Sequence, residues 1–333
     1  MPAASSRSGA AVLGCGMAVP DRVLTNLEFE QMFDTTDEWI RTRTGIEQRR
    51  IAAPNEATAT FATAAGAHAL KEAGLTPDDL DLILVATCTP DMPVPGSAPL
   101  VQASLGAGSA GAFDINAGCT GFISALAMGT SAVESGLARH VLVCGADTLS
   151  RITNYTDRRT AVLFGDGAGA VVLGASTDEP RVGPFVMGCE GERWDLLHVP
   201  AGGSQRPAGN DTVAEHGHTI RMKGQDVYKH ACDRMTQAAR EVLGEIPVDS
   251  VDLVVAHQAN GRIIRTVQER LGLRHDQVVD NVARYGNTSA ASIPIALSES
   301  IASGRLRDGM RVVLVAFGAG FSWAAALVKW GPS

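Results

Sequence analysis

The chain has 333 residues, of which 45% are hydrophobic and 19% charged, a balance typical of a globular protein with a substantial core. A formal net charge of −8 and an aromatic content of 5% argue against a nucleic-acid surface built from basic and stacking side chains. No apolar run approaches the ~18 residues of a membrane-spanning helix. Six scattered cysteines without paired spacing predict a reducing, cytoplasmic setting and no metal site.

Short apolar runs alternate with helix-like stretches, which is typical of an α/β fold with buried strands. Strands are predicted at residues 10–19, 82–87, 112–115, 140–144, 169–173, 253–256 and 311–317. Helices are predicted at residues 57–73, 119–135, 224–243, 262–271 and 289–303.

The two halves of the chain repeat one order of motifs. Residues 81–86 (DLILVA) match residues 252–256 (DLVVA), and further along each half a turn of small residues opens a helix, at 116–122 and at 286–292. The repeat predicts a duplicated unit with halves at 10–175 and 182–333, divided near 175–182. Two stacked copies would bring the equivalent strand–helix turns together at the centre.

Cys119 lies in the small-residue turn of the first half, where the predicted helix begins. A thiol at a helix N-terminus faces unpaired N–H groups and the positive end of the helix dipole, which favour the thiolate. Gly118 and Gly121 allow a sharp turn and a close approach of substrate. The turn therefore predicts a nucleophilic cysteine with a lowered pKa, although inert packing is the more common role of a cysteine at a helix start.

His257 and Asn287 lie at related places in the second half. His257 ends the predicted strand at 253–256, and Asn287 lies in the turn that corresponds to the Cys119 turn. Each residue alone is explained by structure, as a strand-end histidine or as an N-cap. Three chemically active residue types at three related strand or loop ends instead predict one shared site.

Two glycine-rich stretches flank this predicted site. The turn at 317–321 (FGAGF) follows the last strand and can aim the N–H of Ala319 into the site, where it would form an oxyanion hole with the amide of Cys119. The stretch at 164–170 precedes a strand and opens no helix, so it lacks the dinucleotide-binding pattern. We expect it to pack tightly near the site.

Taken together, these motifs resemble the β-ketoacyl-acyl-carrier-protein synthase III family, which initiates fatty acid and polyketide chains. The resemblance extends from about residue 10 to residue 330 and rests on the motifs at 36–46, 116–122, 164–170, 257–260, 286–292 and 317–323. It implies a thiolase-like fold with duplicated halves in five αβαβα layers and a homodimer. It also implies a catalytic triad formed by Cys119, His257 and Asn287.

The resemblance further implies the substrates and their contacts. The family takes an acyl-CoA and a malonyl-acyl-carrier protein as substrates, and no cofactor is expected. Trp39 and Arg158 occupy family positions that clamp the adenine of CoA, and Arg43 occupies a position that contacts its phosphate. Asn260 occupies the position of a residue that orders water near the triad and is grouped with the substrate contacts. Family positions on the basic face that receives the acidic carrier protein are occupied by Lys229, Arg262 and Arg265.

The implied reaction is an acyl transfer followed by a decarboxylative Claisen condensation. Cys119 attacks the acyl thioester while the oxyanion hole carries the negative charge. His257 and Asn287 then donate hydrogen bonds to the malonyl thioester oxygen and stabilise the enolate that loss of CO₂ leaves. The carbanion attacks the acyl-cysteine. Because asparagine cannot ionise, the site gains a second donor without a second titrating group.

One departure from the family concerns the acyl pocket. The proline-rich loop at 90–95 lines this pocket in the family, partly across the dimer interface. Val94 stands where members selective for short primers often carry an aromatic side chain. We therefore expect a larger or differently shaped pocket, which favours branched, longer or unusual starters over strict acetyl selectivity.

Two other functions fit parts of the pattern. A related acyltransferase would pass the acyl group from Cys119 to another acceptor without forming a carbon–carbon bond. Such an enzyme has no enolate to stabilise, so the presence of both His257 and Asn287 favours condensation. A non-catalytic partner subunit would typically lack the nucleophile, which is present here.

Overall fold

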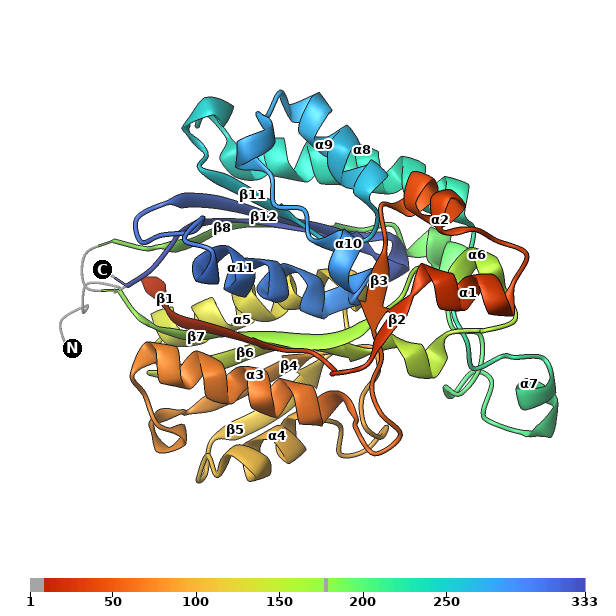
Figure 1. Ribbon diagram of the computed structural model, residues 1–333. Helices are drawn as coiled ribbons and strands as arrows, with labels where there is room; N and C mark the ends of the chain where they lie inside the picture. The colour runs from red at the N-terminus through yellow and green to blue at the C-terminus, as the bar shows by residue number, and fades with distance from the viewer. Residues whose placement is uncertain (1–8, 177–178, 333) are drawn as a thin grey trace.

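The computed structural model describes residues 9–176 and 179–332. The two large β-sheets alternate with three layers of helices (Figure 1). The outer helices are α3 (Thr58–Ala73) and α4 (Ala98–Leu105) on one side and α8 (Gly224–Leu243) and α9 (Gly261–Leu271) on the other. Between the sheets lie α5 (Gly121–Glu134) and α11 (Ser292–Ala302). This arrangement confirms the predicted αβαβα layering.

The two sheets have the same internal plan. The first has the order β1 (Ala10–Ala18), β7 (Asp166–Ala175), β6 (Val141–Thr148), β4 (Leu82–Ala86) and β5 (Gly111–Ile115). The second has the order β11 (Leu253–Ala256), β12 (Arg311–Gly318), β13 (Ser322–Lys329) and β8 (Val182–Cys189). In both, a parallel pair is followed by two antiparallel neighbours, β4–β6–β7–β1 matching β11–β12–β13–β8. An isolated bridge between Val254 and Val278 takes the place beside β11 that β5 takes beside β4.

The equivalent turns of the two halves also have the same local form. A 3₁₀ turn, η2 (Gly118–Thr120), precedes α5, and a second 3₁₀ turn, η7 (Ser289–Ala291), precedes α11. The two turns contact each other at the centre of the molecule. The chain passes from β7, which ends at Ala175, to β8, which begins at Val182, and residues 177 and 178 of the predicted boundary lie outside the described residues.

Glycines on the sheets let the central helices approach closely. A methyl group added at Gly145 of β6 would lie 2.2 Å from the carbonyl oxygen of Ala290, and one at Gly169 of β7 would lie 2.6 Å from the carbonyl carbon of Pro294. The predicted glycine-rich stretch at 164–170 therefore packs tightly against the α11 segment. Strand β7 begins at Asp166, three residues before its predicted start, because these glycines already belong to the strand.

The sequence patterns missed several elements. Strand β13 lies between β12 and β8, yet its alanine run (Ala324–Ala326) has a helix-forming composition, so burial in the sheet overrides local preference. Strand β8 contains Gly183 and Pro184, which weaken a strand pattern and suit an edge position. The smaller missed elements are β2 (Val23–Thr25), α1 (Asn26–Met32), α2 (Asp37–Thr44), β3 (Gln48–Arg50), α4 (Ala98–Leu105), α6 (Arg158–Ala161), β9 (Leu197–His198), α7 (Asn210–Ala214), β10 (Arg221–Met222) and α10 (Val282–Tyr285).

Helix α8 follows the amphipathic pattern that its sequence predicts. Its buried positions recur every three or four residues, at Ala231, Met235, Ala238 and Val242, and this face packs on the second sheet. Within the described residues, none of the helices combines the length and apolar character needed to cross a membrane.

Candidate active site

A cavity of about 560 Å³ lies between the two halves. Cys119 lines it from the first half, while His257 and Asn287 line it from the second. Asn260 and Ala319 also contribute to its wall. The structure therefore brings these five predicted residues, which come from ends of several strands and turns, to one cavity.

Cys119 lies in η2, pressed against the turn that follows β12. A methyl group added at Gly318 would lie 2.8 Å from both the nitrogen and the Cβ of Cys119. The backbone N–H groups of Cys119 and Ala319 lie close enough to the Cys119 sulfur to lower its pKa, against the larger effect of burial. Two amides from opposite halves thus lie beside the reacting sulfur, where they could face the carbonyl oxygen of an acyl group carried by Cys119.

The Cys119 thiol is protonated in the free chain. Burial raises its pKa to about 12, and the nearby Asp147 carboxylate adds to the rise. Hydrogen bonds from Ser289 and the two amides act in the opposite direction. The predicted lowering of the pKa is therefore wrong here, because desolvation outweighs the helix terminus and because α5 begins two residues later, at Gly121.

His257 follows β11 and is 2% exposed. Its Nδ1 lies 2.7 Å from the hydroxyl oxygen of Ser292, and this oxygen accepts a hydrogen bond from the N–H of Gln258 at 3.3 Å. The serine proton is thus available to Nδ1, and we assign the imidazole proton to Nε2, which becomes a donor. Burial lowers the pKa of His257 to about 4, so the ring is neutral at pH 7.

Asn287 is 9% exposed and is held by its backbone and its side-chain oxygen. Its N–H donates to the carbonyl of Leu163 at 2.8 Å, and its own carbonyl accepts from the N–H of Gly165 at 3.0 Å. The side-chain Oδ1 accepts from the N–H of Ser289 at 2.9 Å. Because this oxygen is occupied, the NH₂ end of the carboxamide is the end available to a ligand.

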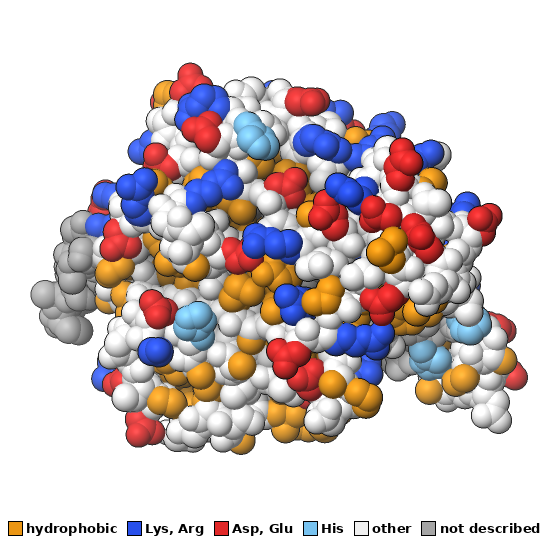
Figure 2. Space-filling view, viewed as in Figure 1, with side chains coloured by type: hydrophobic (Ala, Val, Ile, Leu, Met, Phe, Trp, Pro, Cys, Tyr) orange, Lys and Arg blue, Asp and Glu red, His pale blue; other side chains and the backbone are white. Residues whose placement is uncertain are grey.

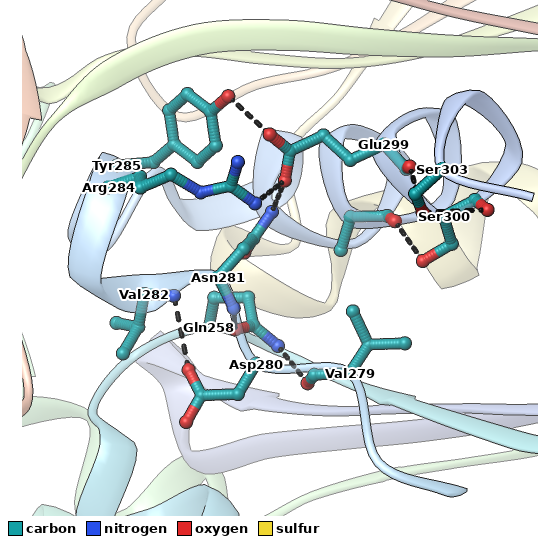
Figure 3. Close-up of polar contacts among 11 residues, drawn as sticks. Gln258, Val279, Asp280, Asn281, Val282, Arg284, Tyr285, Glu299, Ser300 and Ser303 are labelled. Carbon is teal, nitrogen blue, oxygen red and sulfur yellow. Dashed lines mark hydrogen bonds and ion pairs between the residues drawn. The ribbon is translucent and has the colours of Figure 1, made fainter. Parts of the chain in front are cut away.

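The loop that leads to Asn287 is fastened to α11 by Glu299 (Figure 3). The Glu299 carboxylate accepts hydrogen bonds from the side chains of Asn281 (2.7 Å), Arg284 (2.7 Å) and Tyr285 (2.6 Å). The side-chain oxygen of Gln258, the residue after His257, accepts from the backbone N–H of Asn281 at 2.9 Å. One network therefore holds the segments that carry both cavity donors, His257 and Asn287.

Sequence reasoning missed three residues that orient the site. Ser289 and Ser292 are polar members of the small-residue motif at 286–292, and their place in a turn that opens a helix was the available signal. Asp147 is fully buried at the end of β6. It accepts hydrogen bonds from Thr87, Cys88 and Thr89 in the first half and from the N–H of Ala290 in the second. Its carboxylate thus joins the two halves beneath the cavity.

Comparison with known proteins places this site in a family. Residues 113–191 match the family model described as 3-oxoacyl-[acyl-carrier-protein (ACP)] synthase III, and residues 244–330 match its C-terminal part. The β-ketoacyl-[acyl-carrier-protein] synthase III of Caldanaerobacter subterraneus subsp. tengcongensis is 50% identical over 324 residues, which cover 96% of this chain and 98% of the relative. The chain belongs to the β-ketoacyl-[acyl-carrier-protein] synthase III family.

Solved structures of similar proteins agree with this assignment. The 3-oxoacyl-[acyl-carrier-protein] synthase III of Aquifex aeolicus is 45% identical, with a TM-score of 0.89 and coverage of 97% of this chain and 100% of the other. The priming β-ketosynthase of the R1128 polyketide pathway is 38% identical, with a TM-score of 0.91 and 98% coverage of each chain. The predicted resemblance and the thiolase-like fold are both confirmed.

The residues expected to contact CoA gather beside helix α2. The Arg158 guanidinium lies over the Trp39 ring at 5.3 Å from the centroid, and Arg43 lies over the same ring at 6.0 Å. Asn260 lines the cavity and donates to the backbone carbonyl of Arg43 at 3.2 Å. A base stacked between Trp39 and Arg158 would require Arg158 to swing away, because their present spacing leaves no room for a third planar group.

The residues expected on the carrier-protein face lie on α8 and α9. Lys229, Arg262 and Arg265 are exposed, and none of them forms an ion pair with another described residue. Arg262 lies over the ring of Tyr228 at 5.2 Å, and Tyr228 lines the cavity. Figure 2 shows basic side chains among acidic ones over the part of the molecule where α2, α8 and α9 lie. One of these three cations, Arg262, therefore adjoins a residue of the cavity wall.

Val94 lies apart from the cavity of the single chain. It is 84% exposed on the loop between β4 and α4 and does not contribute to the cavity wall. The apolar part of the wall combines branched side chains with aromatic and methionine side chains, including Leu149, Ile152, Leu163, Leu197, Val199, Ile220, Phe164, Phe317, Met222 and Met235. A role for Val94 in the acyl pocket therefore stays a prediction that depends on a second chain.

The pKa of His257 predicts an unusual pH dependence. Above pH 6.5 the histidine is neutral in both folded and unfolded chains, whereas between about 6.5 and 4 only the unfolded chain binds the proton. The free energy of unfolding should therefore fall by up to about 3 kcal/mol as the pH falls through this window. Denaturant titrations of the chain and of His257→Gln should show this loss in the first protein and much less of it in the second. An equal loss in both would contradict the assignment.

Gly318→Ala should disturb the nucleophile directly. The added methyl group would lie 2.8 Å from Cys119, so the sulfur or the amide of Ala319 must move. We expect acyl loading to slow by about 10²-fold, the scale of loss for a misplaced reacting group. The matched control is Gly191→Ala, where an added methyl group meets nothing within 4 Å. Equal loading rates for both variants, measured by mass spectrometry, would contradict the predicted crowding.

Proposed function

We propose that this member of the family transfers an acyl group from acyl-CoA to Cys119 and joins it to malonyl-acyl-carrier protein with loss of CO₂. The observation that supports this most is the arrangement of three groups around one cavity. A thiol facing two amides lies opposite a neutral histidine and an asparagine whose free ends are both donors. This set can stabilise a tetrahedral oxyanion in one step and an enolate in the next.

In the acyl-transfer step, the Cys119 sulfur attacks the thioester carbon of acyl-CoA. The negative charge that develops on the carbonyl oxygen is stabilised by the N–H groups of Cys119 and Ala319. The carbon–sulfur bond to CoA breaks, and CoA leaves as a thiol with the proton that the cysteine loses. The buried thiol therefore gives up its proton within the reaction and need not be ionised beforehand.

In the condensation step, the thioester oxygen of malonyl-acyl-carrier protein accepts hydrogen bonds from Nε2 of His257 and from the NH₂ group of Asn287. Both donors stabilise the enolate that forms as the carbon–carbon bond to CO₂ breaks. The enolate carbon attacks the acyl carbon on Cys119, the carbon–sulfur bond to Cys119 breaks, and the released thiolate takes up a proton from water. Burial of His257 favours its neutral form, so the ring donates a hydrogen bond without carrying a charge.

A homodimer is part of this proposal. Strand β5 is the last strand of the first sheet, so one edge of it is unpaired among residues 9–176 and 179–332. Phe113 on β5 is 50% exposed, and Val94 lies on the loop that Asp114 of β5 holds through the N–H of Ser97 at 2.8 Å. Pairing of β5 with a second copy would cover these side chains and place Val94 near the partner's cavity.

The proposal also covers the cellular compartment, the cofactor requirement and the acyl group that the enzyme takes as its starter. All six cysteines are free thiols, which supports a reducing, cytoplasmic setting. Acyl-CoA enters as a substrate, and the steps above use no further cofactor. The apolar cavity wall supports a branched or medium-length acyl starter over a strictly two-carbon one.

Charge reversal on the carrier-protein face should affect the KM for malonyl-acyl-carrier protein and the KM for malonyl-CoA differently. The double variant Lys229→Glu/Arg262→Glu should raise the KM for malonyl-acyl-carrier protein by about ten-fold and leave that for malonyl-CoA nearly unchanged, because only the acidic carrier uses these cations. Lys71→Glu, which reverses an exposed cation on α3, is the control. An equal rise in KM for both donors would place these residues in the substrate tunnel instead.

The proposed reaction is tested by release of ¹⁴CO₂ from carboxyl-labelled malonyl-acyl-carrier protein in the presence of acyl-CoA. Condensation predicts one CO₂ released for each acyl group consumed. Consumption of acyl-CoA without release of CO₂ would show plain acyl transfer and refute the proposal.

A further inference from the structure

Two of the six cysteines line the same cavity. Cys88 follows β4 and Cys119 follows β5, and these strands pair in parallel with Ala86 opposite Ile115. The N–H of Thr87 continues this pairing by donating to the carbonyl of Ile115 at 3.1 Å. The two thiols therefore follow neighbouring strands and face the same cavity.

A single hydroxyl group lies beside both sulfurs. The Oγ of Ser289 is 3.9 Å from the Sγ of Cys88, and the same side chain makes a hydrogen bond with the Cys119 thiol. Ser289 has a φ of +48°, a left-handed conformation that is uncommon for a residue other than glycine. Its N–H is fixed by Asn287. The neighbour that the two thiols share is thus held in place, which keeps both sulfurs close to one point.

Cys88 is positioned as a free thiol and is not simply a small apolar residue. Its Sγ donates to the Oδ1 of Asp147 at 3.3 Å, and its backbone N–H donates to the same oxygen at 2.8 Å. Both Cys88 and Cys119 are half-buried, whereas Cys15, Cys144 and Cys232 are fully buried. The two cavity thiols therefore combine proximity with access for a small reagent, which the three buried cysteines lack.

We propose that Cys88 is a resolving thiol for Cys119, so that peroxide converts the pair to a reversible disulfide. A peroxide oxidises the Cys119 thiol to sulfenic acid, and hydrogen peroxide is reduced to water in this step, which is slow because burial keeps the thiol protonated. The Cys88 sulfur then attacks the sulfenic sulfur, the S–O bond breaks, and the Cys88 proton leaves with the oxygen as a second water. Two thiols have lost two electrons, and a dithiol reductant returns both.

This disulfide would protect the nucleophile. A sulfenic acid without a neighbouring thiol is oxidised further to sulfinic acid, which dithiols do not reduce. Side-chain rotation with a small backbone adjustment must bring the sulfurs to bonding distance, and the loop after β4 and the η2 turn are the segments that would move. A Cys119 that carries an acyl group is blocked, so substrate should slow the reaction.

The test treats the intact protein, Cys88→Ser and Cys189→Ala with excess hydrogen peroxide, followed by dithiothreitol. Serine keeps the size and the hydrogen bond to Asp147 but cannot form the bridge, and Cys189 is an exposed cysteine that serves as the control. Each protein is compared with its own untreated sample. We expect the intact protein and Cys189→Ala to regain most of their activity, and Cys88→Ser to regain less than about a tenth.

Peptide mass spectrometry gives a readout that does not depend on activity. The proposal predicts a linked peptide that contains residues 88 and 119 in the peroxide-treated intact protein, and sulfinic acid at residue 119 in Cys88→Ser. It is overturned if no linked peptide forms, or if residue 119 reaches sulfinic acid equally fast in both proteins. Because neither outcome involves CO₂ release, failure here is distinguishable from failure of the proposed condensation.

Discussion

Asn287→Ala should leave acyl loading of Cys119 intact and slow decarboxylation of malonyl-acyl-carrier protein by about 10²- to 10³-fold, the loss typical of removing one oxyanion donor. The physical reason is that the two steps use different hydrogen-bond donors. The amides of Cys119 and Ala319 face the acyl thioester, whereas Asn287 offers its NH₂ group to the cavity from the opposite half. Acyl loading is read by intact-protein mass, and decarboxylation by release of ¹⁴CO₂.

The control for this variant is Asn210→Ala, which removes an exposed carboxamide at the start of α7, outside the wall of the catalytic cavity. It should change neither rate. If Asn287→Ala instead blocked loading while CO₂ release continued at the normal rate, the roles assigned to the two halves of the site would have to be exchanged.

Cys119→Ala should abolish acyl loading and reduce condensation by about 10⁴-fold or more, since no other group can carry the acyl intermediate. The same variant should still release CO₂ from malonyl-acyl-carrier protein, because His257 and Asn287 keep their positions. Their orientations depend on Ser292 and Ser289, and not on the sulfur. Product formation and CO₂ release therefore separate in this variant, whereas they are coupled in the intact protein.

Cys189→Ala is the matched control for the loss of a thiol, since Cys189 is exposed and lies outside the cavity wall. Full loading of the Cys119→Ala variant, with the acyl group found on Cys88, would show that the neighbouring cavity thiol is the nucleophile. Such a result would contradict the assignment of Cys119.

The layered fold was predictable because its signals are local and repeated. Buried parallel strands appear in the sequence as apolar runs, such as residues 82–86 and 253–256. The amphipathic spacing of apolar residues likewise indicates helix α8. Strand β13 was not predicted because alanine is a good helix former. It forms a strand because it pairs on both sides, with β12 and with β8. That information is non-local, so no window of sequence contains it.

The sequence allowed the residues of the site to be predicted, but not the pKa of Cys119 or all of the contacts that orient the site. The motifs locate Cys119, His257 and Asn287 because equivalent turns of a duplicated unit meet at its centre. The pKa of Cys119 was predicted in the wrong direction because the helix terminus is visible in the sequence, whereas the burial of the sulfur depends on packing from both halves. Ser292 was missed for a related reason, since its partner His257 is 35 residues away along the chain, whereas the contact of Ser289 with Asn287 is local and lies within the motif itself.

The most direct test is a single turnover. The chain is first loaded with an acyl group on Cys119, freed of acyl-CoA, and mixed with malonyl-acyl-carrier protein, and the carrier is then weighed by intact mass spectrometry. Decarboxylative condensation predicts a carrier that has gained the acyl group and lost CO₂, while Cys119 returns to the free thiol. A carrier that bears the acyl group alone, or an acyl group that stays on Cys119 while product appears, would contradict the assignment of all three residues to one reaction.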